Sequence, residues 1–451
     1  MSEPRSIAVI DVGATNAKLV HFDPELRVLS ERAFPVRRRA GPPYLHLEPE
    51  AIVEAARAGL AAFDAERPVD AIIPATHGSA LALLDRAGRL ALPVMSYLAE
   101  IPDDVAAAYT AVAPPFSEVF APTNPGALTL ARQLLWQESH WPADFARAET
   151  ALPYAQYFAW RLSGVAASEV SALGAQTHLW APLEGGFSSL ARDRGWDRLF
   201  APLRGAAERL GPARMTGLRG RAEVLVGVHD SNANFHRYAA AAPDPPALLS
   251  TGTWIIAFEP GVAMSALDGA RDQVANVTVA GRPIASARFM GGQEYAALAG
   301  PEPPQPSLEA IAGLVGRGVM ALPSFSRSGG PFPLTAGRGR VVGGAPRTAQ
   351  ESASLAALYT ALMTAEMLAM PGASGPLVVD GPFARNDAYL ATLAALLPHR
   401  PVLSSGESRG AAAGAAALAL REVPPPRLQP VTPAEIAGLE SYRARWRAAI
   451  G

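Results

Sequence analysis

The chain has 451 residues, of which 49% are apolar, and a formal net charge of −2. This length predicts two or three domains that each bury a core. The slightly acidic balance argues against nucleic acid as a partner, and the absence of cysteine excludes disulfides, thiolate zinc sites and cysteine nucleophiles.

The N-terminal residues 1–6 have no apolar signal sequence, and the chain has no run of the roughly 20 apolar residues that a membrane helix needs. We therefore expect a cytoplasmic protein with no membrane partner.

The most informative segment, residues 7–23, predicts a hairpin around a small polar turn. An apolar run ends at Asp11, the turn Gly13-Ala14-Thr15-Asn16 follows, and a second strand begins at residue 18. Backbone N–H groups and a hydroxyl of such a turn can face phosphate oxygens, and the carboxylate before it can hold a metal ion. The same pattern is also typical of an ordinary hairpin turn.

Lys18 is the only lysine in the chain, and every other fixed positive side chain is arginine. A compact ammonium that serves a phosphate is one explanation for its retention. Chance survival of a single lysine is the other.

Further along the chain, strand and helix patterns alternate in both halves and predict α/β structure. Thr123 or Asn124 is expected to cap the helix at 128–136, and the proline cluster at 243–246 is the expected domain boundary. We expect one domain over 1–243, a second over 244–425 and a C-terminal helix within 426–451. The expected strands are 69–74, 81–84, 224–227, 247–250, 254–258 and 376–379; the expected helices are 128–136, 152–162, 232–242, 355–370, 386–397 and 409–420; and the expected loops are 301–306 and 424–430.

The second half repeats the hairpin pattern of the N-terminus. Its turn is Thr251-Gly252-Thr253, and a further turn, Asp380-Gly381-Pro382, follows a later strand. We interpret the repeat as a structural duplication, with a nucleotide held in a cleft between two related domains. A Walker-type Gly-x-x-x-x-Gly-Lys-Ser/Thr loop does not occur, which argues against a P-loop route to ATP.

Two polar segments are candidates for substrate chemistry. Asp230 follows a strand and precedes a helix, where it can accept a proton from an attacking hydroxyl or simply cap the helix. His77 and Gly78 follow a strand in the first half and can bind a polyhydroxy substrate, although a loop role is the common alternative. Gln293 and Glu294 are further polar candidates.

Together these motifs resemble those of the FGGY carbohydrate kinases, a branch of the actin-like ATPase superfamily, over most of the chain. IAVIDVGATNAKLV is similar to the family's first phosphate motif and LLSTGTW to its second. GVHDSNANF is similar to the segment that carries the catalytic aspartate, and VVDGPFARNDAYLATLAALL to the adenosine motif. The resemblance implies a two-lobed α/β fold of the ribonuclease H-like type with an interdomain cleft.

The resemblance also implies a role for each matching residue. Asp230 would be the base that takes the proton of a sugar hydroxyl and would also bind the substrate, with His77 and Gly78 beside the sugar. Asp11 would help to hold Mg²⁺ with ATP. The implied nucleotide ligands are Gly13, Thr15, Asn16 and Lys18 in the first half and Gly252, Thr253 and Gly381 in the second.

Within that family, Gly-Val-His-Asp followed by Ser-Thr-Gly-Thr-Trp is most similar to the fuculose and rhamnulose kinases. The resemblance therefore implies ATP-dependent phosphorylation of a ketose such as L-fuculose or L-rhamnulose. Other ketoses or polyols such as xylulose or ribulose, a non-kinase actin-like ATPase and a sugar-sensing protein are the alternatives. The sequence leaves the oligomeric state open, and a homodimer is one option.

Overall fold

The computed structural model describes residues 4–327, 330–407 and 409–450. The chain divides into two compact units. The first comprises Met1–Ala241, Ala275–Pro283 and Arg409–Pro425, and the second comprises Ala242–Val274, Ile284–Ser408 and Pro426–Gly451. These units differ from the contiguous domains expected from the sequence, because two later segments are counted with the first unit.

The elements of the first unit begin with a hairpin and alternate thereafter. In chain order they are β1 (Ile7–Val12), β2 (Asn16–Phe22), β3 (Val28–Pro35), β4 (Arg38–Arg39), β5 (His46–Leu47), α1 (Pro49–Glu66), β6 (Ala71–Thr76), β7 (Leu81–Leu84), α2 (Asp103–Val112), α3 (Phe116–Val119), α4 (Leu130–His140), α5 (Pro142–Phe145), β8 (Thr150–Pro153), α6 (Tyr154–Ser163), α7 (Val170–Leu173), β9 (Trp180–Ala181), β10 (Gly186–Phe187), α8 (Ser189–Asp193), η1 (Trp196–Leu199), β11 (Arg209–Pro212), β12 (Glu223–Leu225), β13 (Val228–His229), α9 (Asp230–Ala239) and, much later, α14 (Gly410–Ala417).

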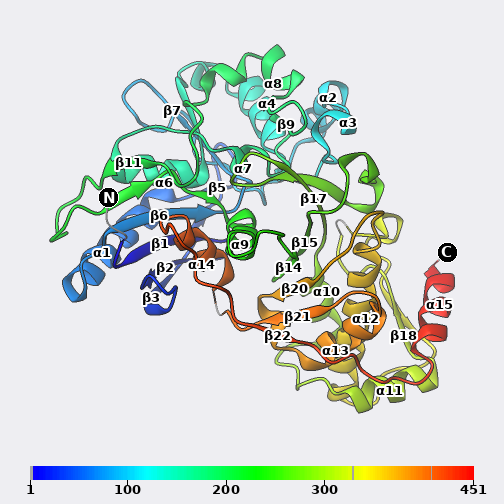
Figure 1. Ribbon diagram of the computed structural model, residues 1–451. Coiled ribbons are helices and arrows are strands. Elements are labelled where there is room, and N and C mark those ends of the chain that lie inside the picture. The colour runs from blue at the N-terminus through cyan, green and yellow to red at the C-terminus, as the bar shows by residue number, and fades with distance from the viewer. Residues whose placement is uncertain (1–3, 328–329, 408, 451) are drawn as a thin grey trace. The chain divides into compact units, whose positions relative to one another are not determined.

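The main sheet of the first unit has the order β11-β12-β6-β1-β2-β3, and β13 also pairs with β6 (Figure 1). β1 is antiparallel to β2 and parallel to β6. Both faces of this sheet are covered, so β1 is an almost continuous apolar run, as expected for a strand that is buried on both faces.

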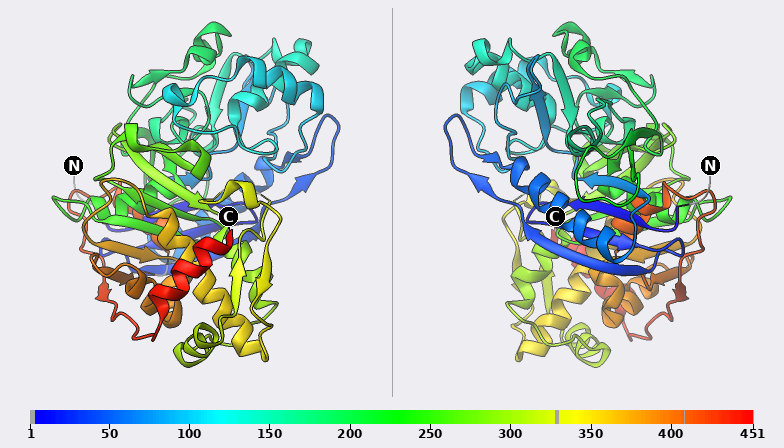
Figure 2. Two further views of the ribbon diagram at one scale, coloured as in Figure 1. Left: turned by 90° about the vertical axis from the view of Figure 1, so that its right-hand side faces the viewer. Right: turned by 90° about the vertical axis from the view of Figure 1, so that its left-hand side faces the viewer.

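Side chains of β1 alternate between two cores. Ala8, Ile10 and Val12 pack with α1 and α6, whereas Ile7 and Val9 pack with the alanine-rich α14. The right-hand view of Figure 2 shows α1 in front of these strands. The small side chains of α14 allow close approach to α9, since a Cβ on Gly414 would lie 1.7 Å from the Ala233 carbonyl oxygen. This packing explains why the segment after Arg409 belongs to the first unit.

The second unit contains β14 (Ala247–Thr251), β15 (Ile255–Glu259), η2 (Met264–Ala266), η3 (Gly269–Arg271), β16 (Gln273–Val277), β17 (Pro283–Phe289), α10 (Gly291–Ala299), α11 (Leu308–Arg317), β18 (Met320–Leu322), η4 (Pro333–Thr335), β19 (Arg340–Val342), α12 (Ala349–Met367), β20 (Leu377–Asp380), η5 (Pro382–Arg385), α13 (Asp387–Leu396), β21 (Val402–Ser405), β22 (Leu428–Pro430) and α15 (Leu439–Ile450). The residues of β16 and β17 that fall within 275–283 are counted with the first unit.

The sheet of the second unit has the order β16-β17-β15-β14-β20-β21-β22 (Figure 1). Its core contains Leu249 of β14, Val379 of β20 and the buried face of α12. Trp446 of α15 joins this core, and its indole N–H donates to the Ala321 carbonyl oxygen at 2.7 Å.

The two sheets repeat one topology, which confirms the duplication expected from the sequence. In the first, β1 lies between antiparallel β2 and parallel β6. In the second, β14 lies between antiparallel β15 and parallel β20. The pairing continues outward in the same sense, with β3 matching β17 and β12 matching β21.

Several element predictions need correction. The helix expected at 128–136 begins at Leu130 after Thr129, so neither Thr123 nor Asn124 caps it; instead, the Asn124 N–H donates to the Thr129 hydroxyl at 3.2 Å. The helix expected at 152–162 starts two residues later because β8 occupies its first residues. The loop expected at 424–430 includes the edge strand β22. Within the described residues, no helix is long and apolar enough to span a membrane.

Candidate functional site

The turn between β1 and β2 presents small polar residues beside a carboxylate. The Gly13 N–H donates to the Asn16 carbonyl oxygen at 3.1 Å, and the Val36 N–H donates to the Thr15 carbonyl oxygen at 3.0 Å. These bonds fix the turn, while the side chains of Thr15 and Asn16 stay exposed. The hairpin that the sequence predicted around this turn is therefore present.

Asp11 and Lys18 are direct cross-strand partners in this hairpin. Burial and the negative charge of Asp230 together raise the pKa of Asp11 to about 7, and Lys18 opposes the shift. Two carboxylates that repel each other in a partly dry site form a good position for a divalent cation, which would favour ionised Asp11.

Among the described residues, no group of three or more histidine or acidic side chains is arranged to hold a metal ion alone. The two carboxylates of Asp11 and Asp230 nevertheless fit Mg²⁺, because that ion is ordinarily bound through one or two carboxylates and takes its remaining ligands from phosphate and water. Asp11 and Asp230 are the side chains that would hold it.

Asp230 is the first residue of α9, and its side chain remains 26% exposed. The His229 Nε2 atom lies 3.3 Å from the Asp230 Oδ1 atom, and the Asn232 amide nitrogen lies 2.9 Å from His229 Nδ1. An amide nitrogen only donates, so this arrangement makes Nδ1 the acceptor and leaves the proton on Nε2, facing Asp230. Burial lowers the pKa of His229, which keeps the ring neutral. Asp230 is therefore an accessible carboxylate with a fixed neighbour.

The helix-cap alternative for Asp230 is wrong in detail. His229 occupies the N-cap position of α9 and makes no side-chain cap bond. Asp230 instead accepts hydrogen bonds from the N–H and hydroxyl of the adjacent Ser231.

Gly78 and His77 lie after β6, next to this group. A Cβ on Gly78 would stand 2.7 Å from the Ala175 Cβ and 3.2 Å from the His229 ring, so only glycine fits without a shift. The pKa of His77 is lowered to about 4, chiefly by burial and also by His229, while Asp230 acts in the opposite direction. The His77 ring is therefore a neutral hydrogen-bonding group.

Aromatic rings surround His77. The ring centroids of Tyr97 and Tyr154 each lie 5.4 Å from that of His77. The hydroxyl of Tyr154 and the Nδ1 atom of His77 are buried and have no hydrogen-bond partner in the described part of the chain. Buried polar atoms of this kind ordinarily find a partner, and a polyhydroxy ligand would provide one.

The corresponding turn of the second unit, residues 251–253, is tightly packed. The Thr251 hydroxyl donates to the Asp380 carbonyl oxygen at 2.5 Å and accepts from the Phe383 N–H at 3.1 Å. A Cβ on Gly381, whose φ is +89°, would stand 2.0 Å from the Thr251 carbonyl oxygen. Gly381 therefore packs directly against the turn, and residues 251–253 and 380–383 are held together by these contacts.

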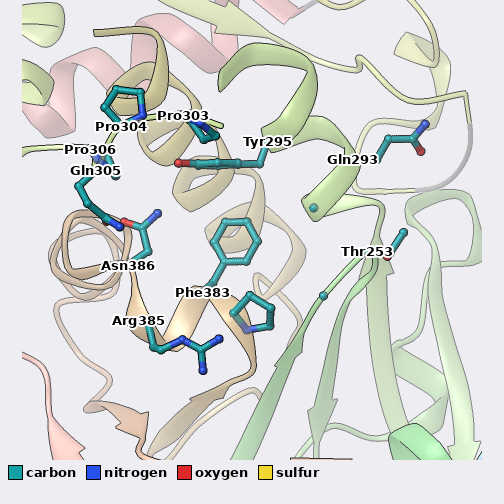
Figure 3. A pocket seen from close by; sticks show the side chains of 13 residues that line it. Thr253, Gln293, Tyr295, Pro303, Pro304, Gln305, Pro306, Phe383, Arg385 and Asn386 are labelled. Carbon is teal, nitrogen blue, oxygen red and sulfur yellow. The ribbon is translucent and has the colours of Figure 1, made fainter. Parts of the chain in front are cut away.

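Gly252 differs from its neighbours because its Cβ position is open, with the nearest atom at 3.8 Å. Together with Thr253 it lines a cavity of about 590 Å³ in the second unit. Figure 3 shows the Tyr295 and Phe383 rings side by side in this cavity. Their centroids lie 5.3 Å apart at an angle of 87°. The full lining is Gly252, Thr253, Gly292, Gln293, Tyr295, Pro303, Pro304, Gln305, Pro306, Pro382, Phe383, Arg385 and Asn386.

This cavity has the composition of a site for a flat heterocycle with a polar substituent. Aromatic and proline faces provide the apolar contacts, whereas the side chains of Gln305, Arg385 and Asn386 provide polar groups at one side (Figure 3). Asn386 is fixed in place, since its Oδ1 atom accepts from the Tyr389 N–H at 3.0 Å.

The structure therefore places the predicted residues in two groups. Asp11, Lys18, His77 and Asp230 belong to the first unit, and electrostatic effects connect Asp11 and His77 to Asp230. Gly252 and Thr253 line the cavity of the second unit, and Gly381 packs against the neighbouring Thr251.

Sequence reasoning missed most of the aromatic lining. Tyr97 and Tyr295 lie in a loop and a helix without a distinctive local pattern, whereas Phe383 lies within the segment similar to the adenosine motif but was not singled out. Gln293 was noted as a polar candidate and lines the cavity of the second unit, whereas its neighbour Glu294 is buried and accepts hydrogen bonds from the loop after β18.

Comparisons with known proteins match this architecture. Residues 243–427 match the family described as carbohydrate kinase FGGY, C-terminal domain. A carbohydrate kinase from Novosphingobium aromaticivorans is 34% identical, with a TM-score of 0.86 over 98% of this chain and 100% of that chain. A comparison with curated proteins found no match.

More distant solved structures share the fold alone. A gluconate kinase from Lactobacillus acidophilus is 13% identical, with a TM-score of 0.79 over 99% of this chain and 97% of that chain. A xylulose kinase from Rhodospirillum rubrum is 18% identical, with a TM-score of 0.79 over 99% of this chain and 98% of that chain. The expected α/β fold of the actin-like ATPases is thereby confirmed.

Proposed function

Because the chain belongs to the FGGY carbohydrate kinases, we propose that it transfers the γ-phosphate of ATP to a hydroxyl of a ketose similar to L-fuculose or L-rhamnulose. Its class, a sugar phosphotransferase, follows from the family. The ketose and the residue roles are what the proposal adds.

The observation that carries these roles is the accessible carboxylate of Asp230 beside neutral His229 and within electrostatic reach of Asp11. Asp230 accepts the proton of the attacking hydroxyl, and the Nε2–H of His229 orients the carboxylate. His77 and Gly78 border the sugar, whose hydroxyls satisfy the unpaired Nδ1 atom of His77 and the Tyr154 hydroxyl.

Each unit offers contacts for a nucleotide. The turn with Gly13, Thr15 and Asn16 binds phosphate oxygens, with Lys18 as a nearby positive charge. Asp11 and Asp230 would hold Mg²⁺, which would supply positive charge beside the phosphates.

The second unit has nucleotide contacts of its own. Gly252 and Thr253 bind phosphate, and the cavity beside them receives adenosine. The open space at Gly252 supports this role, because a ligand can approach the backbone there.

A panel of ketoses tests the proposal. Purified protein with ATP and Mg²⁺ should release ADP only when an acceptor is added, with L-fuculose or L-rhamnulose above xylulose and ribulose. Release that does not depend on sugar would instead indicate an ATPase, and preference for xylulose would overturn the assigned substrate.

Asp230→Asn tests the catalytic assignment. Loss of a well-placed base costs roughly 10²–10⁴-fold in rate, so kcat should fall by that factor while the melting temperature stays near that of the wild type. Unchanged turnover would remove Asp230 from the reaction. Asp193→Asn in α8 is the matched control and should leave kcat unchanged.

A further inference from the structure

Three consecutive arginines follow β3, and only the middle one turns inward. Arg37 and Arg39 are exposed, whereas Arg38 is half-buried. Arg39 forms an ion pair with Glu48 at 2.7 Å. Arg38 instead donates through Nη2 to the carbonyl oxygen of Ala14, in the middle of the turn that borders Asp11 and Lys18.

The charge of Arg38 is not neutralised by the protein. Within the described residues, no carboxylate lies within ion-pairing distance of its guanidinium, and its Nε–H is buried without a hydrogen-bond partner. An incompletely paired buried cation costs stability. A site that repeatedly binds an anion gives a reason for such a group to be kept.

Arg38 also lies close to the proposed sugar site. The positive charge of Arg38 lowers the pKa of His77, although less than burial and His229 do. It opposes the effect of burial on the pKa of Tyr97 and of Tyr154. The guanidinium is therefore near both the phosphate turn and the ring of residues around His77.

We propose that Arg38 is a catalytic residue that contacts the phosphoryl group while it passes from ATP to the sugar. The inference rests on the proposed function. In the transfer, the sugar oxygen forms a bond to the γ-phosphorus, the bond between that phosphorus and the β–γ bridging oxygen breaks, the hydroxyl proton goes to Asp230 and ADP leaves. Negative charge on the three equatorial oxygens of the phosphoryl group is stabilised by a fixed guanidinium, which needs no reorganisation during the step.

The test compares the variants Arg38→Ala and Arg38→Lys with the control Arg39→Ala. The control removes one positive charge from the adjacent residue, as Arg38→Ala does at residue 38. Arg38→Ala should lower kcat by about 100-fold or more, with KM for the sugar changed less than about threefold. Arg38→Lys keeps the charge but loses the planar fork, so it should recover part of the loss. Arg39→Ala should retain the wild-type kcat.

A binding measurement separates contact with the phosphoryl group from support of the turn. ADP with aluminium fluoride and sugar imitates the phosphoryl group in transfer, and tight binding of such a mimic reports interactions of the transition state. Arg38→Ala should weaken binding of this mixture at least tenfold more than binding of ADP alone. Equal weakening of both would show that Arg38 only shapes the turn.

Other outcomes are equally decisive. An effect of Arg38→Ala that is confined to KM for the sugar would make Arg38 a sugar ligand and overturn the inference. The same holds if Arg38→Ala and Arg39→Ala lower kcat equally. A wild-type enzyme that phosphorylates none of the sugars would overturn the proposed function itself. An active wild type with an equally active Arg38→Ala variant would overturn only the role of Arg38.

Discussion

Gly292, the second residue of α10, should be intolerant of even one added methyl group. An alanine Cβ there would stand 2.2 Å from the Gly252 carbonyl oxygen and 3.2 Å from the Thr253 Cα atom. Carbon–oxygen contacts need about 3.3 Å. The turn at 251–253 or the start of α10 must therefore move by roughly 1 Å.

Two effects on stability compete in Gly292→Ala. Replacing glycine by alanine in a helix favours folding by up to about 1 kcal/mol, whereas overpacking of a fixed site costs about 1–3 kcal/mol. We expect the second effect to win because both contacting atoms belong to backbone. The loss in nucleotide handling should be larger, since a displacement of about 1 Å at a reacting group costs on the order of 100-fold.

The assay measures kcat and KM for ATP by sugar-dependent ADP release, the affinity for ADP by calorimetry, and the melting temperature. Gly316→Ala is the matched control, because no atom lies within 4 Å of its added Cβ and the residue belongs to α11 of the same unit. It should raise the melting temperature slightly and leave KM unchanged. If Gly292→Ala behaves like this control, the turn is not held by α10 and the reasoning fails.

Three further predictions concern stability and the nucleotide cavity. Burial lowers the pKa of His236 to about 4. Between pH 6.5 and 4 the folded state therefore binds fewer protons than the unfolded chain, so the stability of the fold decreases as pH drops through that window. His236→Gln should flatten the dependence of melting temperature on pH, and an unchanged slope would show that another group causes the loss. Glu294 accepts hydrogen bonds from the Phe325 N–H at 2.8 Å and the Tyr359 hydroxyl at 2.7 Å, so Glu294→Gln should destabilise by about 1.5–3 kcal/mol in denaturant unfolding, whereas Glu309→Gln on α11 should have little effect. Phe383→Ala should weaken ADP binding about tenfold or more through loss of a ring that lines the cavity, and unchanged affinity would place adenosine elsewhere.

The sequence alone indicated the repeated strand–turn–strand units because their signals are local. A short apolar run that ends at a small polar turn has few alternatives, and both hairpins form where residues 7–23 and 247–258 predicted them. The position of Asp230 at the start of a helix followed from the same kind of local pattern.

The partners of these residues could not be predicted in the same way, because they come from distant parts of the chain. Arg38 reaches Ala14 from the short strand β4, and α14 joins the first unit although more than 160 residues separate it from α9. No local pattern distinguishes Arg38 from Arg37 and Arg39; burial and hydrogen bonding do. The sequence by itself determined which segments form turns and which residue types can handle phosphate, whereas tertiary packing decided which of those side chains are dry, unpaired and close enough to act together.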